Sequence, residues 1–111
     1  MTRVTASHTP RRVIVTGAGV GIGAAIARAF RAAGDEVALL DIDAESAGAL
    51  GAEIGASSFH CDVRDRDSVE AAMSAAVGTL SGIDVLCANA GISSMAHAVE
   101  LSDADWTSNM D

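Results

Sequence analysis

The feature that most constrains the fold of this chain is a run of closely spaced glycines directly after a short apolar segment. Residues 13–15 are β-branched and apolar, which predicts a buried strand. Residues 21–33 carry apolar side chains at helical spacing, which predicts a helix. The segment that joins them reads Thr16, Gly17, Ala18, Gly19, Val20, Gly21, Ile22 and Gly23. A strand, a glycine-rich turn and a helix in this order form the context in which backbone groups bind a phosphate.

Three of these glycines have separate physical roles in that context. Gly17 permits a tight turn straight out of the strand. Gly21 lets a diphosphate approach the helix N-terminus, where free N–H groups and the helix dipole attract anions. Gly23 lets the helix pack closely on the strand. The chain has a net charge of −8, so a backbone site of this kind explains how it would hold a negative ligand.

Strand and helix signals alternate along the rest of the chain. We predict further strands at residues 37–40, 57–61 and 83–88, and further helices at 44–54 and 66–80. Asp43 and Asp65 are the predicted N-caps of these two helices. A last helix is expected to begin near Asp103, because Ser102 and Asp105 form a capping-box pattern.

The first helix should bury one face and end at a glycine. Its predicted apolar face contains Ile22, Ile26 and Phe30, with Ala25, Ala29 and Ala33 beside them. Arg28 and Arg31 fall on the other face, and Gly34 is the predicted stop signal.

Continuous apolar strands that alternate with helices predict a parallel sheet covered on both faces. Right-handed crossovers then favour a Rossmann-like, doubly wound α/β fold with the strand order 3-2-1-4. In this arrangement the ligand crevice lies at the carboxyl ends of strands 1 and 4, where the order reverses. We therefore divide the chain into a flexible N-terminal tail at residues 1–11 and one domain at residues 12–111.

An acidic residue supports a dinucleotide as the ligand. Asp41 ends the predicted second strand, 18 residues after Gly23. A carboxylate at this place can accept hydrogen bonds from both hydroxyls of an adenosine ribose, and it would repel a 2′-phosphate. The alternative role is a helix cap, which Asp43 suits better.

Composition excludes several kinds of chemistry. The chain has no tyrosine, and all seven of its basic residues are arginine. A tyrosine acid/base, a lysine Schiff base and a G-x-x-x-x-G-K phosphate loop are therefore excluded. The strongly negative charge argues against nucleic acid and anionic membranes as partners. No apolar stretch is long enough to predict a membrane-spanning helix.

The cysteines and histidines do not have the spacing of metal ligands, so we expect no metal site. Cys61 and Cys87 are expected to be free thiols in a reducing cytoplasm. A Cys/His pair for nucleophilic catalysis is an alternative. Both cysteines fall at the ends of apolar runs, however, which favours burial as small hydrophobes. His97 is expected on a surface loop.

The twin arginine Arg11-Arg12 has an alternative explanation. Followed by a Gly/Ala-rich apolar run, with Ala25, Ile26 and Ala27 as a small-residue cleavage site, it is similar to an export signal. The phosphate loop is the better explanation of the glycines in this run.

Four motifs, each at a predicted strand end, are similar to those of the short-chain dehydrogenase/reductase family. Residues 16–23 resemble its T-G-x-x-x-G-I-G cofactor motif, and Asp41 stands where that family has its NAD-selecting acid. Asp62 and Val63 resemble its D-V element after the third strand. Residues 88–93 resemble its N-N-A-G-I motif after the fourth strand. The resemblance extends from Arg12 to Asp111. Taken alone, Asp62 could be a solvated strand end and residues 89–91 an ordinary turn.

The resemblance implies a role for each matching residue. Gly17, Gly21, Ile22 and Gly23 would line the pyrophosphate, Asp41 would bind the ribose, and Asp62 and Val63 would bracket the adenine. Residues 89–91 would run under the ribose carbons. The implied cofactor-binding set is Thr16, Gly17, Gly19, Gly21, Ile22, Gly23, Asp41, Ile42, Asp62, Val63, Asn89, Ala90 and Gly91.

The resemblance also implies a cofactor preference. Family members that prefer NADP usually carry a basic residue at the position of Val20 or of Ile42. Both positions are apolar here, and Asp41 opposes a phosphate. We therefore expect NAD to be preferred over NADP.

The chain departs from the family pattern in two places. Ala88 replaces the first asparagine of the fourth-strand motif, which helps to hold the sheet in place. The family's catalytic set is an asparagine, a serine and a Tyr-x-x-x-Lys pair, and this chain has neither tyrosine nor lysine. Asn109 lies just before the expected position of the asparagine, so that role is not transferred to it. No residue of the chain is named catalytic.

We therefore expect the cofactor-binding, N-terminal half of an NAD-dependent oxidoreductase, truncated before its catalytic segment. The complete enzyme would move hydride between nicotinamide and an alcohol or carbonyl substrate. The substrate becomes a partner only if a catalytic half exists, and a homo-oligomer is expected of a complete family member. The alternative is a catalytically silent fragment that is at most a dinucleotide-binding module.

Overall fold

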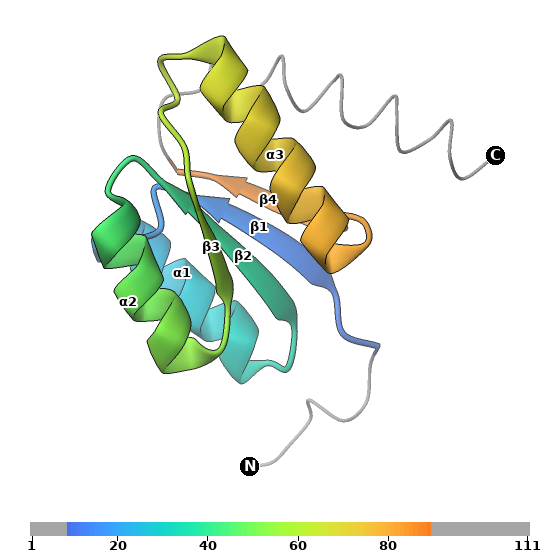
Figure 1. Cartoon of the computed structure of the whole chain (residues 1–111). Helices are drawn as coiled ribbons and strands as arrows, with labels where there is room; N and C mark the ends of the chain where they lie inside the picture. Colours follow the sequence, from blue (N-terminus) through green and yellow to red (C-terminus); the bar gives the residue numbers. More distant parts are fainter. Residues whose placement is uncertain (1–8, 90–111) are drawn as a thin grey trace, which may run out of the picture.

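The computed structural model describes residues 9–89, which form a four-stranded sheet covered by three helices (Figure 1). The elements are β1 (Arg12–Thr16), α1 (Gly21–Ala32), β2 (Glu36–Asp41), α2 (Ala44–Ile54), β3 (Ser57–His60), α3 (Arg66–Leu80) and β4 (Val85–Ala88). All strands are parallel, and their order is β3-β2-β1-β4. The predicted α/β, Rossmann-like fold and its strand order 3-2-1-4 are confirmed.

Alternating strand residues build two cores, one on each face of the sheet. Ile14, Ala38 and Leu40 point to one face and pack with Val69 and Met73 of α3. On the other face, strand residues pack with apolar residues of α1 and α2: Val13, Val15, Val37, Leu39, Ala27, Ala47 and Leu50. Figure 1 shows the same division, with α1 and α2 on one side of the sheet and α3 on the other. Strands buried on both faces explain the continuous apolar runs of the sequence.

The N-terminal caps of α2 and α3 are confirmed. The Asp43 carboxylate accepts a hydrogen bond from the Ser46 backbone N–H, and Asp65 accepts bonds from the N–H groups of Asp67 and Ser68. In contrast, α1 begins after Val20, which provides no side-chain hydrogen bond to the helix. Among the helices of the described range, α1 alone therefore starts without a side-chain cap. The last predicted helix, with Ser102, Asp103 and Asp105, lies outside the described residues.

The buried face of α1 differs from the prediction. Ile22 is 71% exposed, whereas Gly23 and Ala27 are buried. Ile26 and Phe30 pack on the core only in part. The reason is a close approach of helix and turn: a Cβ atom at Gly23 would lie 2.0 Å from the Gly17 carbonyl oxygen. The helix faces the sheet through its smallest residues, so Ile22, about 100° round the helix, is directed away from the core.

Arg11 is hydrogen-bonded to residues at the start of β2. Arg11, which the sequence assigns to the tail, donates its backbone N–H to the Asp35 carboxylate, and its carbonyl accepts a bond from Glu36. Arg12 in turn forms an ion pair with Asp84, just before β4. Both residues of the twin arginine are thus part of the folded domain, and the Gly/Ala-rich run after them forms β1, the turn and α1.

Candidate functional site

The predicted site residues of the described range gather at the carboxyl ends of the strands. The turn after β1, the end of β2, the segment after β3 and the residue after β4 all lie at this edge. A cavity of about 300 Å³ opens here, lined by Gly17, Leu40, Asp41, Ile42, Cys61, Asp62, Val63 and Arg64. Motifs that are up to 46 residues apart in the sequence are therefore brought to one cavity.

The glycine-rich turn adopts a conformation that requires glycine at two positions. Gly17 and Gly21 have φ angles of 62° and 65°, in the left-handed region that side chains with a Cβ rarely enter. The Gly17 N–H donates to the Leu40 carbonyl over 2.8 Å, which joins the turn to β2. Among the described residues, and apart from its chain neighbours and the backbone of its own helix, no atom would lie within 4 Å of a Cβ at Gly21. The backbone at the start of α1 is thus open to a ligand.

Thr16 and Asn89 join the turn to β4. Thr16 has no exposed surface, and its hydroxyl accepts a hydrogen bond of 2.9 Å from the Asn89 backbone N–H. The Asn89 side-chain amide donates to the Gly17 carbonyl over 3.4 Å. Thr16 therefore holds the carboxyl ends of β1 and β4 together from inside the protein. Ala90, Gly91 and His97 lie outside the described residues.

Two backbone amides hold the Asp41 carboxylate in place. Its Oδ2 atom accepts a bond of 2.8 Å from the N–H of Gly19, and its Oδ1 atom accepts one of 2.8 Å from the N–H of Asp43. A Cβ at Gly19 would lie 2.9 Å from Ser46 Cβ and 3.1 Å from Asp41 Oδ2. The missing side chain at position 19 thus lets the glycine-rich turn contact the end of β2. Asp41 links these two parts of the site and still lines the cavity.

Asp62 is paired with a residue that the sequence analysis did not select. The Arg64 side chain donates from Nε to Oδ1 over 3.0 Å and from Nη2 to Oδ2 over 3.1 Å, and the Arg64 backbone N–H also donates to Oδ1. These hydrogen bonds, those of the Arg64 side chain above all, lower the pKa of the Asp62 carboxyl. In the sequence, an arginine two residues after an acidic residue at a strand end is only a weak sign of such a pair. The direction of the arginine side chain depends on the conformation of the turn between them.

Three large apolar side chains of the described range are exposed, and all of them flank this edge. Val20 and Ile22 are 71% exposed and Ile42 is 51% exposed. Val20 lies in the glycine-rich turn, Ile22 lies in the first turn of α1, and Ile42 directly follows β2. A largely apolar cavity that also holds the charged side chains of Asp41, Asp62 and Arg64, with exposed aliphatic groups beside it, suits a ligand that has both apolar rings and polar groups.

The two cysteines are free thiols. Cys61 is buried and Cys87 is half-buried, and burial is the main cause that raises the pKa of each thiol. Neither is therefore activated as a nucleophile. Between residues 9 and 89, no group of three or more His, Cys, Asp or Glu side chains could hold a metal ion. In the same range, no helix is long and apolar enough to cross a membrane.

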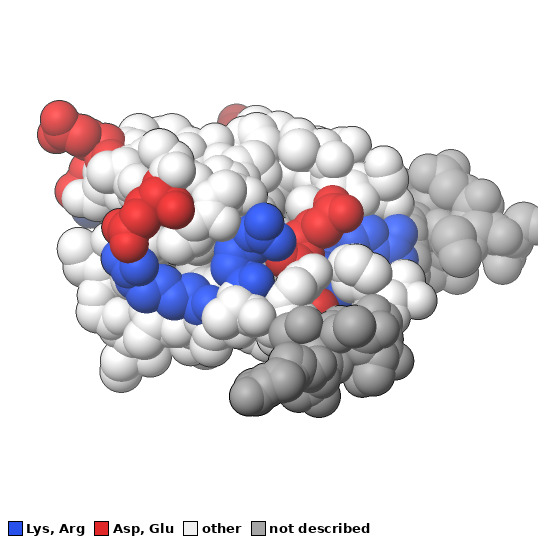
Figure 2. Space-filling view, turned by 90° about the horizontal axis from the view of Figure 1, so that it is seen from below, with Lys and Arg blue, Asp and Glu red and all other residues white. Residues whose placement is uncertain are grey.

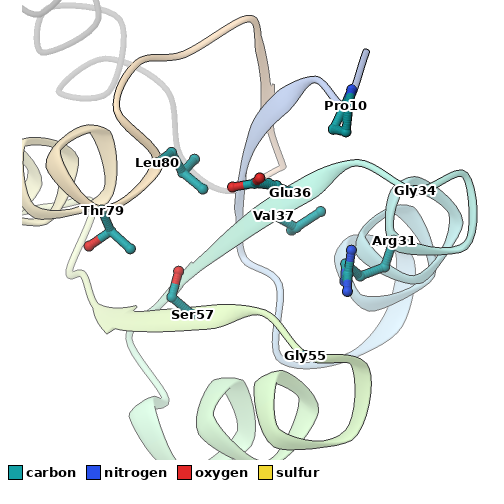
Figure 3. Close-up of a pocket in the computed structure, with 9 residues that line it drawn as sticks. All are labelled: Pro10, Arg31, Gly34, Glu36, Val37, Gly55, Ser57, Thr79 and Leu80. Carbon is teal, nitrogen blue, oxygen red and sulfur yellow. The ribbon is translucent and has the colours of Figure 1, made fainter. Parts of the chain in front are cut away.

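A second hollow, of about 370 Å³, lies at the opposite edge of the sheet (Figure 3). Its lining includes Glu36 and Ser57, at the amino ends of β2 and β3, and Arg31 of α1. The Arg31 guanidinium donates to the carbonyl oxygens of Ile54 and Asp35. This arginine ties the ends of α1 and α2 together. None of the predicted cofactor-binding residues lines this hollow.

Charged side chains pair with one another over the described surface. Figure 2 shows basic and acidic side chains side by side on one face of the molecule rather than in separate patches. The ion pairs join Arg11 to Asp35, Arg12 to Asp84, Arg28 to Glu53, Arg64 to Asp62 and Arg66 to Glu70. On the face that Figure 2 shows, acidic side chains therefore lie beside the basic ones.

Comparison with known proteins gives consistent matches. The family model described as "short chain dehydrogenase" matches residues 11–111. D-threitol dehydrogenase from Mycolicibacterium smegmatis is 44% identical over 102 residues, which cover 87% of this chain and 39% of that protein. Nodulation protein G from Rhizobium sp. (strain N33) is 42% identical over 100 residues, which cover 88% of this chain and 41% of that protein. The chain thus spans about two fifths of the length of these relatives.

Solved structures have the same fold. A short-chain type dehydrogenase/reductase from Mycobacterium marinum superposes with a TM-score of 0.78 at 26% identity, over 86% of this chain and 51% of that chain. A 3-ketoacyl-(acyl-carrier-protein) reductase from Brucella melitensis, solved in complex with NADH, gives a TM-score of 0.65 at 32% identity. This match covers 67% of this chain and 31% of the reductase chain.

Proposed function

The chain belongs to the short-chain dehydrogenase family, and from this membership we propose that its carboxyl edge binds the adenosine and pyrophosphate portion of NAD. The family's oxidoreductase chemistry uses a nicotinamide cofactor, and the Brucella melitensis relative was solved with NADH. The proposal assigns the pyrophosphate to the start of α1, the ribose to Asp41 and the adenine to the segment after β3.

The start of α1 suits the pyrophosphate because, within residues 9–89, no side chain caps its N–H groups. Asp43 and Asp65 cap the other two helices, whereas Val20 cannot cap α1. The free N–H groups and the helix dipole together attract an anion. Gly21 leaves the space in front of these groups open. This local positive potential would hold two phosphates on a chain of net charge −8.

The fixed position of Asp41 is the observation that carries the preference for NAD. Two hydrogen bonds of 2.8 Å to backbone N–H groups prevent the carboxylate from turning away when a ligand enters. Its remaining lone pairs can accept bonds from the 2′- and 3′-hydroxyls of a ribose. A 2′-phosphate would meet the negative charge of Asp41 without a basic residue at Val20 or Ile42 to offset it.

The whole protein would be an oxidoreductase that moves hydride between nicotinamide and an alcohol or carbonyl compound. The nicotinamide ring supplies the hydride chemistry, and the residues of this chain bind and orient its adenosine half. A tyrosine and a lysine for proton transfer would come from a segment beyond this chain. We therefore expect this chain to bind NAD without turnover. Its free thiols support the proposed location in a reducing cytoplasm.

Calorimetric titration of the 111-residue chain with NAD and with NADP tests the proposal. We expect NAD to bind about tenfold or more tightly than NADP, because the 2′-phosphate of NADP would be repelled by the Asp41 carboxylate. Asp41→Ser should shift this ratio toward NADP. Asp43→Asn is the matched control, because it removes a neighbouring carboxylate that caps α2 and should leave the ratio unchanged. Tighter binding of NADP by the unaltered chain would contradict the cofactor assignment. A folded chain that binds neither dinucleotide would support the silent fragment.

A further inference from the structure

The pair formed by Arg64 and Asp62 lies in the cavity that the proposed function assigns to the adenosine of NAD. Both residues line this space together with Asp41 and Ile42. Asp62 follows β3, and Arg64 belongs to the short connection between β3 and α3. Arg64 matches none of the motifs that placed the cofactor, so its position in the cavity needs a separate explanation.

Arg64 supplies three of the hydrogen bonds that orient the Asp62 side chain. Its Nε and backbone N–H both donate to Oδ1, at 3.0 Å each, and Nη2 donates to Oδ2 over 3.1 Å. The Asp62 backbone is held separately by a bond of 2.9 Å from its N–H to the Ser68 hydroxyl. The backbone of Asp62 therefore does not depend on Arg64, whereas the direction of its carboxylate does.

The pair leaves acceptor capacity on the carboxylate. A carboxylate offers about four lone-pair sites, and Oδ2 receives only the bond from Nη2 among those found in the described structure. The Asp62 side chain is 25% exposed, so a ligand can reach it, and that of Arg64 is 79% exposed. Because little else packs on it, the guanidinium is positioned by Asp62, and each of the two side chains orients the other.

We propose that Arg64 determines base specificity by holding the Asp62 carboxylate as the acceptor for the 6-amino group of adenine. The inference rests on the proposed NAD site and deepens it. A carboxylate accepts a hydrogen bond from an amino group and repels the oxygen of a 6-oxopurine. The guanidinium also offsets one of the two negative charges, Asp41 and Asp62, that line the cavity. Arg64 thus acts through Asp62 and is a positioning residue.

A comparison of two dinucleotides isolates this role from general attraction to the phosphates. NAD and nicotinamide hypoxanthine dinucleotide differ only where the 6-amino group is replaced by a 6-oxo group, with the matching change at N1. The unaltered 111-residue chain should bind NAD about tenfold more tightly, the size expected for one hydrogen bond to a charged acceptor. Arg64→Ala should weaken NAD binding more than binding of the analogue, and reduce the ratio to about threefold or less.

Matched variants complete the experiment. Arg66→Ala removes the same charge two residues further on, from the pair with Glu70 on α3, and should leave the ratio unchanged. Asp62→Ala should lower the ratio as Arg64→Ala does, and the double variant should lower it no further. Arg64→Lys retains the charge but loses the two-pronged geometry, so an intermediate ratio is expected.

The outcomes separate the two hypotheses. An equal loss of affinity for both dinucleotides in Arg64→Ala would overturn the inference, because the arginine would then act only as a charge for the phosphates. An unchanged ratio with unchanged affinities would also overturn it. If the folded, unaltered chain binds neither dinucleotide, the proposed NAD site fails, and the role of Arg64 fails with it.

Discussion

Both edges of the sheet contain ion pairs, with Arg64 and Asp62 at the carboxyl edge, but the edges differ in how their other polar groups are used. At the amino edge, charged groups pair within the protein: Arg11 with Asp35, and Arg12 with Asp84. At the carboxyl edge, the Asp41 carboxylate is held by backbone N–H groups, and α1 starts without a side-chain cap. The first arrangement joins the strand ends, whereas the second leaves hydrogen-bonding capacity for a ligand.

The size of a hollow does not distinguish the two edges. The hollow at the amino edge has a volume of about 370 Å³, and the cavity at the carboxyl edge about 300 Å³. Arg31 lines the former and already donates to two backbone carbonyls. Asp41 and Asp62 line the latter, and the bonds they accept from described residues leave lone pairs on each carboxylate. The accessible hydrogen-bonding groups, rather than the volume, favour the carboxyl edge as the proposed ligand site. Three substitutions test this contrast.

The largest effect is expected from a change at the carboxyl edge, Gly23→Ala. The new Cβ would lie 2.0 Å from the Gly17 carbonyl oxygen and 3.0 Å from Asn89 Nδ2. Since the first of these contacts is with backbone, α1 or the turn must move. We expect a loss of about 3 kcal/mol in the free energy of unfolding, measured by urea denaturation, together with the loss of NAD binding.

Gly78→Ala is the control for this substitution. Gly78 also lies in a helix, but a Cβ at its position would meet no atom of the described residues within 4 Å outside its neighbours and its own helix backbone. Alanine should therefore stabilise α3 by up to about 1 kcal/mol through its better helix propensity. If Gly23→Ala were as stable as the unaltered chain and still bound NAD, the close contact would not matter for the site.

Local patterns in the sequence predicted most of the helices and strands, because hydrophobic periodicity and helix caps depend on residues that are close together in the sequence. The predicted bounds of α2 and α3 agree with the structure, and those of α1 differ by one residue. The strand predicted at residues 83–88 begins at Val85 in the structure, and Ile83 and Asp84 precede it. The Asp84 carboxylate forms an ion pair with Arg12 at this point.

Contacts between distant residues were beyond the sequence patterns. Ile22 was predicted to be buried, but the close approach at Gly23 decides which face of α1 meets the sheet. The Arg11–Asp35 pair joins residues 24 apart, so it depends on the register of β1 and β2. The motifs selected Asp41 and Asp62, which line one cavity in the structure, but they did not reveal that Arg64 is hydrogen-bonded to Asp62.

Arg11→Ala tests the amino edge and should have an intermediate effect. The Asp35 side chain is fully buried, and Arg11 donates to both of its oxygens, with Nη2 at 2.7 Å from Oδ2. The Arg11 guanidinium also lies 5.5 Å from the centre of the Phe30 ring. Removal of this cation leaves a buried carboxylate with less compensation. Because Arg11 itself is half-exposed, we expect a loss of about 2 kcal/mol in urea denaturation.

NAD affinity should change by less than about twofold in Arg11→Ala, since the pair lies at the edge opposite the proposed cofactor site. Arg28→Ala is the matched control. Its partner Glu53 is exposed, so the loss of stability should be about 0.5 kcal/mol or less. A large loss of NAD affinity in Arg11→Ala, without unfolding, would show that the two edges are not independent.

The smallest effect is expected from Asp84→Asn, and it should depend on pH. Hydrogen bonds from the Arg12 side chain are the main cause that lowers the pKa of the Asp84 carboxyl below its ordinary value. The unfolded chain therefore binds a proton at Asp84 at a higher pH than the folded chain does. The contribution of the pair is complete above the ordinary pKa, and it is lost as the pH falls through the lower, folded value. Both residues are one-third exposed, so the substitution should cost up to about 1 kcal/mol at pH 7.

Urea denaturation of the unaltered chain and of Asp84→Asn, from pH 7 to pH 2, should give two stability curves that converge at the acid end. NAD affinity at pH 7 should be the same for both proteins, because the Arg12–Asp84 pair joins β1 to the approach of β4 at the amino edge. A constant difference across this pH range would mean that the charge of Asp84 is unimportant and that its neutral hydrogen bonds to Arg12 stabilise the edge. A difference that grew toward low pH would contradict the direction of the pKa shift.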